Sequence, residues 1–365
     1  MPDLHQKDCQ LVHILQNPSI LSDLKLRQWD LVLRQARRAD LLARLAYLVD
    51  SQGITSSLPD NIRDIFTAAK VIAVKHRQTV EWEIFCIGEA LKDLPVPIVY
   101  LKGAAYILQK LPIANGRLFS DVDIMVPKKL INKAEHNLML NGWATIKQSA
   151  YEQRYYRKWM HELPPLRHRR RQTVIDVHHH ILPGTARYTP DVDKLLDATV
   201  PVNGNGNIRV LAPIDMLLHS MTHLFCEGEF NHGLRDLVDI DGLIKASSMR
   251  EGFWHELVQR AIELELVIPL FYALRYAKYF LLTPIPDNIW QGIHGKLPGR
   301  IRLMLMDVLF KHALLPVHKS CSSVFSNIAR FFLYIRGHYL RMPLHLLLPH
   351  LAVKLFMGWK GGKDA

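Results

Sequence analysis

The sequence predicts an α+β protein in which a small mixed β-sheet lies between helical regions at both ends. Residues 10–92 repeat apolar positions at helical spacing. From Pro97 the pattern changes to short β-type runs that alternate with helical stretches. Apolar helical spacing returns after Pro213 and continues to about Tyr279. This order is typical of a small sheet with helices packed on it.

Four segments follow from these patterns: a helical lead-in (1–92), an α/β module (93–185), a helical domain (186–285) and a basic, apolar helical tail (286–365). In the lead-in, Asp40 is predicted to cap the next helix and Gly53 to end it. Strands are expected within 97–103, 120–126, 142–148 and 172–182, with helices at 104–111 and 128–141 between them. The prolines and glycines between 183 and 206 predict a loop that closes the module.

The composition indicates a folded protein with an uneven excess of positive charge. The chain has 365 residues, 49% of them hydrophobic, and a formal net charge of +12, which excludes a disordered or collagen-like chain. Residues 151–171 carry a net +5 and residues 296–365 a net +9. The four cysteines form no metal-binding pair, and no secretory signal is readable. These features predict a cytoplasmic protein.

The strongest chemical signal is the run Ser120-Asp121-Val122-Asp123. Side chains alternate along a strand, so Asp121 and Asp123 are expected on one face. Two carboxylates placed in this way can hold divalent ions for phosphoryl transfer. The same spacing also occurs in pairs of solvated aspartates at a strand edge, so the neighbouring residues decide between the two interpretations.

Three neighbouring features favour a phosphate-handling site. Lys102 and Gly103 lie where a strand ends and a helix opens, a position at which backbone and a point charge can approach a phosphate. Arg117 precedes the paired aspartates on a loop and could reach a phosphate oxygen. Asp176 is a third aspartate with apolar neighbours on a predicted strand.

Together these residues resemble the nucleotidyltransferase superfamily with a DNA-polymerase-β-like catalytic fold. More narrowly, they resemble a bacterial group of uncharacterised nucleotidyltransferases that share an LKG element, an R-x-x-S-D-[IV]-D element and an I-D-[LV]-H element. The resemblance extends over about residues 25–285. The lysine-glycine pair stands eighteen residues before Asp121, where the superfamily commonly has Gly-Gly or Gly-Ser about a dozen residues before it.

The resemblance implies transfer of a nucleoside monophosphate from an NTP to an acceptor hydroxyl, with release of pyrophosphate. It implies two Mg²⁺ ions, with Mn²⁺ as a substitute, held by Asp121, Asp123 and Asp176, of which Asp176 could instead serve as a base. The residues implied to bind the nucleotide are Lys102, Gly103, Arg117 and Ser120. The acceptor stays open among a protein, a small molecule and an RNA.

Several histidines and charged residues are candidates for supporting roles. His178 follows Asp176 by two positions on the same predicted strand, and His180 by four, so a metal hydrolase built on this face is an alternative. His161 precedes a proline-containing strand and could contact the nucleotide or acceptor. Arg235 and Asp236 could line the cleft from a helix, although Arg235 is also spaced for an ordinary ion pair with Asp239.

The two basic segments leave further partners open. Tyrosines and arginines interleave between 151 and 159, a pattern that suits either an RNA surface or a solvated strand of a hairpin. The apolar tail predicts either a terminal helix pair that packs on the helical domain or an amphipathic element at an anionic membrane surface. A non-catalytic protein that binds nucleotide, RNA or a membrane-associated partner is therefore the main alternative to an enzyme. The sequence does not specify the oligomeric state.

Overall fold

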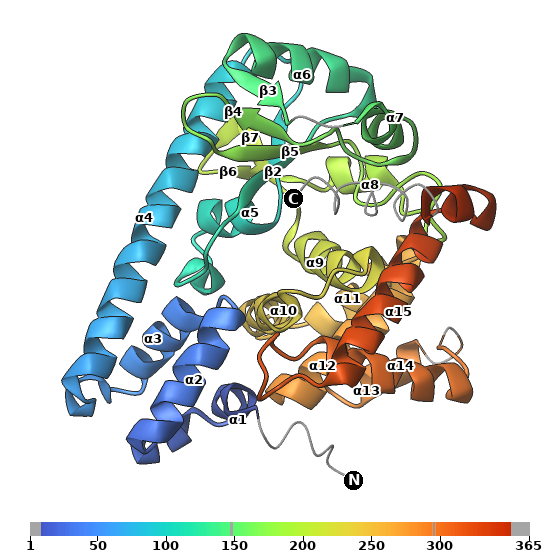
Figure 1. Ribbon diagram of the computed structural model, residues 1–365. Helices are drawn as coiled ribbons and strands as arrows, with labels where there is room; N and C mark the ends of the chain where they lie inside the picture. Colours follow the sequence, from blue (N-terminus) through green and yellow to red (C-terminus); the bar gives the residue numbers. More distant parts are fainter. Residues whose placement is uncertain (1–8, 147–148, 294, 296, 352–365) are drawn as a thin grey trace, which may run out of the picture.

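The computed structural model describes residues 9–146, 149–293, 295 and 297–351 and confirms the predicted α+β class (Figure 1). The described residues form one mixed sheet of seven strands in the order β3-β4-β5-β2-β1-β7-β6. The strands are β1 (Ile98–Tyr100), β2 (Asp121–Met125), β3 (Trp143–Thr145), β4 (Leu166–His168), β5 (Val174–His178), β6 (Val200–Val202) and β7 (Asn205–Val210).

The centre of the sheet consists of the strands that the sequence predicts. β2 pairs in parallel with β5 and antiparallel with β1, and each of these strands is rich in Val, Ile and other buried residues. β1 in turn pairs in parallel with β7. The strands β6 and β7 were not predicted, whereas β4 overlaps the proline-containing strand expected after His161. The expected loop over 183–206 is wrong in its second half, because Pro201 and Gly204 belong to the β6–β7 hairpin, which extends the sheet to Val210.

Helices make up most of the remaining described chain. The N-terminal ones are α1 (Gln10–Gln16), α2 (Leu26–Arg38), α3 (Leu42–Ser51) and α4 (Asp60–Ala90), and those around the sheet are α5 (Lys102–Leu108), α6 (Ile131–Leu140), α7 (Ala150–Trp159) and α8 (Val192–Asp197). The C-terminal ones are α9 (Pro213–Glu227), α10 (Gly233–Ser247), α11 (Phe253–Glu263), α12 (Val267–Leu281), α13 (Asn288–Gly292), α14 (Arg300–Ala313) and α15 (Val324–Arg341). Short 3₁₀ turns are η2 (Pro18–Asp23), η3 (Thr55–Ser57), η4 (Pro112–Ala114) and η5 (Lys128–Leu130).

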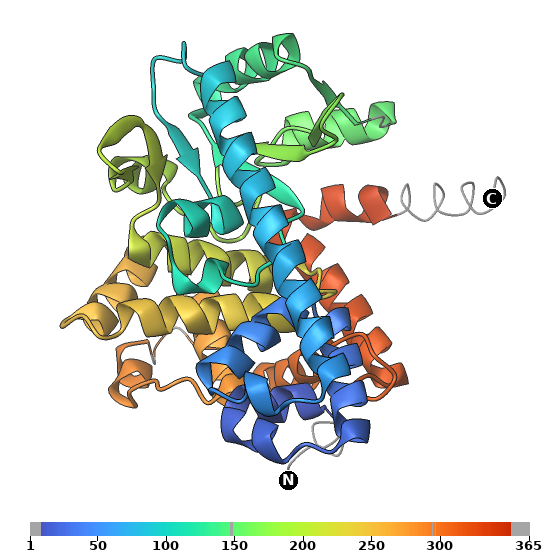
Figure 2. The ribbon, with the colours of Figure 1, turned by 90° about the vertical axis from the view of Figure 1, so that its left-hand side faces the viewer.

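The long helix α4 connects the two halves of the molecule. It packs on α3 at one end and on α5, α6 and β2 at the other. Figure 2 shows it running the height of the molecule in front of both halves. The N-terminal helices and the sheet therefore share one continuous hydrophobic core.

Two predictions about helix ends have different outcomes. Asp40 does not cap α3, because Leu41 is the N-cap residue and Asp40 has a φ of 55°. The side chain of Asp40 instead contacts His232, at 2.9 Å. Gly53 follows the end of α3 with a φ of 70°, so the predicted stop is confirmed.

A hairpin strand, one of the two alternatives for residues 151–159, does not form. These residues form α7, whose first turn is fixed by a capping box between Ser149 and Glu152. In a helix Tyr151 and Tyr155 fall on one face, one turn apart, and their rings lie 6.4 Å apart. This face packs on residues 342–351, which removes the rings from the RNA-type surface that an extended strand would offer.

The tail forms a helix pair that packs on the helical domain, as one of the two predictions had it. α14 packs along α15, and α15 lies on α9. Phe310 of α14 contacts the rings of Phe225 and Tyr272, which are buried between α9 and α12. No helix among the described residues is both long and apolar enough to cross a bilayer. The rest of the predicted tail, 352–365, lies outside the described residues.

The crossing of α15 over the end of α9 brings two backbones into contact. A Cβ atom on Gly337 would lie 2.4 Å from the carbonyl oxygen of Glu227, and one on Gly228 would lie 2.8 Å from that of Leu333. Gly228 also has a φ of 88°, which suits glycine at the end of a helix. The two glycines therefore set the distance between α9 and α15.

We expect Gly337→Ala to lower the free energy of unfolding by about 2 kcal/mol, because the added methyl group overpacks a backbone contact. Gly88→Ala is the matched control, since this glycine lies inside α4 with nothing within 4 Å of the added atom. The control should be neutral or stabilise the protein by up to about 1 kcal/mol. Urea unfolding followed by circular dichroism measures both, and equal effects would contradict the proposed contact.

Candidate active site

Three aspartates lie side by side on the two central strands. β2 and β5 are parallel and in register, with Asp123 opposite Asp176 and Asp121 opposite Val174. Residues opposite each other share a face, as do residues two apart on one strand. The side chains of Asp121, Asp123 and Asp176 therefore belong to the same face of the sheet.

Lys102 and His178 bind the middle carboxylate. Nζ of Lys102 donates to Oδ1 of Asp123 at 3.0 Å, and Nε2 of His178 donates to the same oxygen at 3.1 Å. Lys102 begins α5 with a φ of 43°, an uncommon conformation for a residue with a side chain. Such local strain is typical of functional positions. Asp123 and His178 are both buried.

The three carboxyl groups have different electrostatic environments. Burial acts to raise the pKa of Asp123, but Lys102 and His178 outweigh it and hold that pKa well below its usual range. Burial raises the pKa of Asp121, and repulsion from Asp123 adds to the effect. Burial also raises the pKa of Asp176 well above its usual value, with repulsion from Asp123 as the next cause. The site therefore concentrates negative charge that a cation would stabilise.

Asp176 supplies the clearest sign of a missing partner. Its Oδ1 atom is buried and accepts no hydrogen bond from the described residues. An unpaired buried oxygen is costly in a folded protein. A carboxylate set with such an atom fits a hard divalent ion, which takes oxygen ligands.

A second group of potential metal ligands lies behind Asp123. Among the described residues, one ligand atom each from His161, Glu162 and His178 fall within 4.8 Å of one another. Nδ1 of His178 lies 3.3 Å from Oε2 of Glu162, while its Nε2 atom binds Asp123. Burial lowers the pKa of His161 well below its usual value, so this imidazole is neutral at pH 7. Glu162 directly follows a predicted residue, yet nothing in its own sequence context indicates a role.

The predicted cluster of Asp176, His178 and His180 does not form. β5 ends at His178, so His180 no longer continues the alternation of the strand. Nδ1 of His180 instead accepts the backbone N–H groups of Ile181 and Leu182, at 2.9 and 3.2 Å. A metal hydrolase built on that face is therefore not supported.

Arg117 is held in place by a buried ionic clamp. Its Nε atom donates to Oδ2 of Asp239 at 2.8 Å, and Arg44 donates to the other oxygen at 2.9 Å. The predicted pair between Arg235 and Asp239 is therefore wrong. Arg235 binds Asp236 at 2.9 Å instead, in the same helix α10.

Gly103 makes room for this arginine. A Cβ atom at Gly103 would lie 2.8 Å from Nη1 of Arg117 and 2.6 Å from the ring of Phe119. The guanidinium group also lies 5.2 Å from the centre of that ring. Position 103 therefore requires glycine, because any side chain would collide with Arg117 and Phe119.

The site opens into a cleft made of two adjoining cavities of about 100 and 510 Å³. Lys102, Asp121, Arg235 and Asp236 line both of them. Residues of the smaller cavity that the sequence singled out are Gly103, Arg117, Ser120 and Asp123. Those of the larger one are His161 and Asp176. Ser120 donates to Asp121 at 2.9 Å.

The far wall of the larger cavity comes from α7 and from the C-terminal part of the chain. Tyr334, His338 and Arg341 of α15 line it. The hydroxyl of Tyr151 hydrogen-bonds to Nδ1 of His350 at 2.9 Å. No sequence pattern links the residues of α15 or His350 to the site, because they lie more than 150 positions from the aspartates.

Residues 25–281 match the model of a family described as uncharacterised nucleotidyltransferases. The chain belongs to this family. No curated protein and no solved structure matches the chain significantly. The matched segment contains every nucleotidyltransferase motif that the sequence predicts, whereas the wall contributed by α15 lies beyond it.

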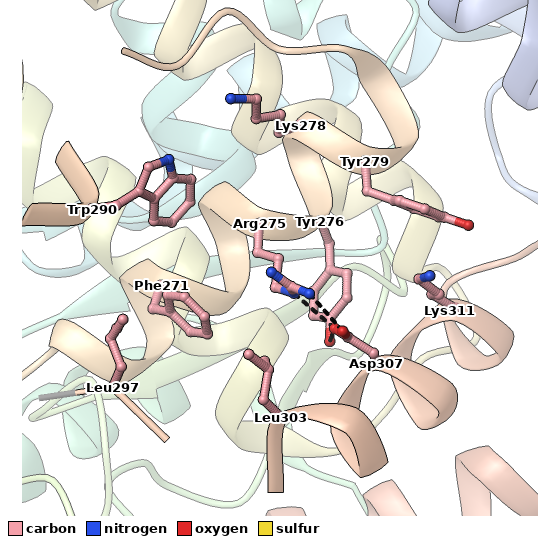
Figure 3. Close-up of a pocket in the computed structure, with 10 residues that line it drawn as sticks. All are labelled: Phe271, Arg275, Tyr276, Lys278, Tyr279, Trp290, Leu297, Leu303, Asp307 and Lys311. Carbon is pink, nitrogen blue, oxygen red and sulfur yellow. Dashed lines mark hydrogen bonds and ion pairs between the residues drawn. The ribbon is translucent and has the colours of Figure 1, made fainter. Parts of the chain in front are cut away.

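Another cavity, of about 540 Å³, lies between α12, α13 and α14 (Figure 3). Phe271, Tyr279 and Trp290 line it. Its carboxylate, Asp307, accepts hydrogen bonds from Arg275 at 2.8 and 2.6 Å. The carboxylate in this cavity is therefore paired, unlike the buried Oδ1 atom of Asp176.

We expect Asp239→Ala to lower the free energy of unfolding by about 3 kcal/mol, because it leaves Arg44 and Arg117 without their counterion in a largely buried place. Asp30→Ala is the control, since it removes the partner of Arg34 in an exposed pair. That change should cost less than about 1 kcal/mol. Urea unfolding measures both variants, and a loss for Asp239→Ala no larger than that of the control would contradict the clamp.

Proposed function

We propose that the protein transfers a nucleoside monophosphate from an NTP, ATP among them, to an acceptor hydroxyl and releases pyrophosphate. The family assignment supports nucleotidyl transfer in general. The observation that carries the specific proposal is the set of three aspartates on one face of β2 and β5. The buried, unpaired oxygen of Asp176 adds to it.

Asp121, Asp123 and Asp176 are the residues proposed to hold two Mg²⁺ ions, for which Mn²⁺ could substitute. When bound, such ions neutralise the triphosphate and stabilise the charge that develops on the attacking and leaving oxygens. The chain contributes fixed positions for these carboxylates, because they lie on paired strands whose apolar residues are buried. Positioning of this kind supplies much of the rate in phosphoryl transfer.

We propose that Lys102 contacts Asp123 in the free protein and a phosphate of the NTP once the nucleotide is bound. Its ammonium group now contacts Asp123, and the charge of this carboxylate helps to keep the pKa of Lys102 raised. The lysine also lines both cavities. When a cation neutralises Asp123, the ammonium group becomes available for a phosphate oxygen.

The smaller cavity is proposed to bind the phosphates. Arg117, Gly103 and Ser120 line it, and Asp239 fixes the direction of the guanidinium group. A guanidinium held in this way loses little freedom when it binds a phosphate. His178 acts on the site by positioning Asp123, and Arg235 and Asp236 border the passage between the cavities.

We propose that the acceptor enters the larger cavity, which Asp176 lines. If Asp121 and Asp123 hold the ions without Asp176, the buried and unpaired Oδ1 atom of Asp176 is the group proposed to accept the proton of the attacking hydroxyl. His161 and Glu162 border the same space. A cavity of about 510 Å³ accommodates a small molecule, or the end of a protein side chain or RNA.

We expect Asp121→Ala/Asp123→Ala to reduce NTP-dependent labelling of an acceptor by roughly a thousandfold or more, because the cation ligands are lost. The assay incubates the protein with Mg²⁺, each labelled NTP in turn and cell extract. Asp93→Ala is the control, since Asp93 lies exposed in a turn after α4. Equal labelling by the double variant and the wild type would refute the proposal. A protein that binds NTP in calorimetry but labels nothing would support the non-catalytic alternative.

We expect chelation with EDTA to abolish the labelling, and added Mg²⁺ or Mn²⁺ to restore it, because the three aspartates offer only oxygen ligands. Elemental analysis of the purified protein should find no stoichiometric zinc. Restoration by Zn²⁺ alone would instead point to the group formed by His161, Glu162 and His178 as the metal site.

A further inference from the structure

The outer side of α14 and α15 carries an apolar surface that no described residue covers. On α14 the exposed apolar side chains recur one turn apart, and on α15 they do so from Val324 to Phe332. We define the tail surface as these residues: Ile301, Met304, Leu305 and Val308 of α14, and Val324, Phe325, Ile328, Phe331 and Phe332 of α15. Tyr339 lies farther along α15, at the border of this surface, where Arg187 stacks on its ring at 3.8 Å.

The stripes on the two helices form one continuous surface. At one end the ring of His312, one turn beyond Val308, lies 6.3 Å from that of Phe325. At the other end Leu305 and Tyr339 border one shallow cavity. α14 and α15 pack on each other, so the two stripes lie on adjoining helices. Figure 1 shows α14 and α15 at the outside of the helical half.

The charges around the tail surface are almost all positive. Between residues 297 and 351 the sequence has seven arginines and lysines against Asp307. That aspartate is already neutralised by Arg275. Arg300 and Arg302 are exposed on either side of Ile301 at the start of α14, and Lys319 is exposed in the loop between α14 and α15. A second copy of this chain would bring the same positive charges together, which disfavours self-association.

We propose that the tail surface docks on an anionic lipid membrane. Exposed aromatic and aliphatic residues flanked by arginine and lysine are the features by which amphipathic helices bind at a membrane interface. Anionic lipids attract such cations over roughly one Debye length. Since no described helix can span the bilayer, the protein would lie on the membrane surface. This inference is independent of the proposed reaction.

The test is flotation of the full chain with vesicles of phosphatidylcholine and phosphatidylglycerol (3:1), compared with vesicles of phosphatidylcholine alone. We expect binding to the anionic vesicles that weakens as NaCl is raised. Phe331→Ser/Phe332→Ser should weaken it at least tenfold, because both rings would leave the interface. Arg300→Gln/Arg302→Gln should weaken binding to the anionic vesicles by roughly tenfold.

A matched control lies on α4, far from the tail surface. Trp82 and Phe85 are 56% and 55% exposed, and their rings lie 5.3 Å apart. Phe331 and Phe332 are similar, at 59% and 52% exposed and 5.8 Å apart. Trp82→Ser/Phe85→Ser should therefore leave vesicle binding unchanged.

Two results would overturn the proposal. One is a wild-type protein that does not float with anionic vesicles, or that floats equally well after Phe331→Ser/Phe332→Ser. The other is a dimer in sedimentation velocity that this double variant converts to a monomer, since the tail surface would then cover a second copy of the chain. Circular dichroism of each variant checks that the fold is unchanged, which we expect because the substituted side chains are exposed.

Discussion

The parallel pairing of β2 with β5 is the constraint on which the candidate site depends. It places Asp123 opposite Asp176 although the two lie 53 positions apart in the sequence. A shift of one residue in this pairing would turn one of the two strands' aspartates to the other face. The buried Val122, Ile124 and Val177 oppose that shift, because their apolar side chains would then lose their place in the core.

Asp239 connects parts of the molecule that the sequence separates widely. Its two oxygens bind Arg44 from the N-terminal helices and Arg117 from the loop before β2. The aspartate itself belongs to α10 in the C-terminal helical region. Residues from both helical flanks therefore fix Arg117, which lines the cleft beside the aspartates.

Local patterns in the sequence predicted the central strands and the three aspartates, because alternation and short apolar runs reflect burial directly. The same patterns gave wrong predictions where contacts between distant segments determine the structure. The alternating Tyr and Arg residues of α7 are compatible with a strand as well as a helix. Only the capping box between Ser149 and Glu152 indicates the helix. Arg235 has the spacing for an intrahelical pair, but Asp239 binds two arginines from distant segments. Nothing local could indicate that residues of α15 line the cleft.

The backbone contact between Gly337 and Glu227 fixes where α15 lies on the end of α9. One side of this helix carries Phe331 and Phe332 outward, while Tyr334 and His338 border the cleft from another side. Where the two helices cross, at Gly228 and Gly337, no side chain separates their backbones. A single helix therefore belongs to the outer surface of the molecule and to the wall of the larger cavity, so a substitution that displaces α15 alters both.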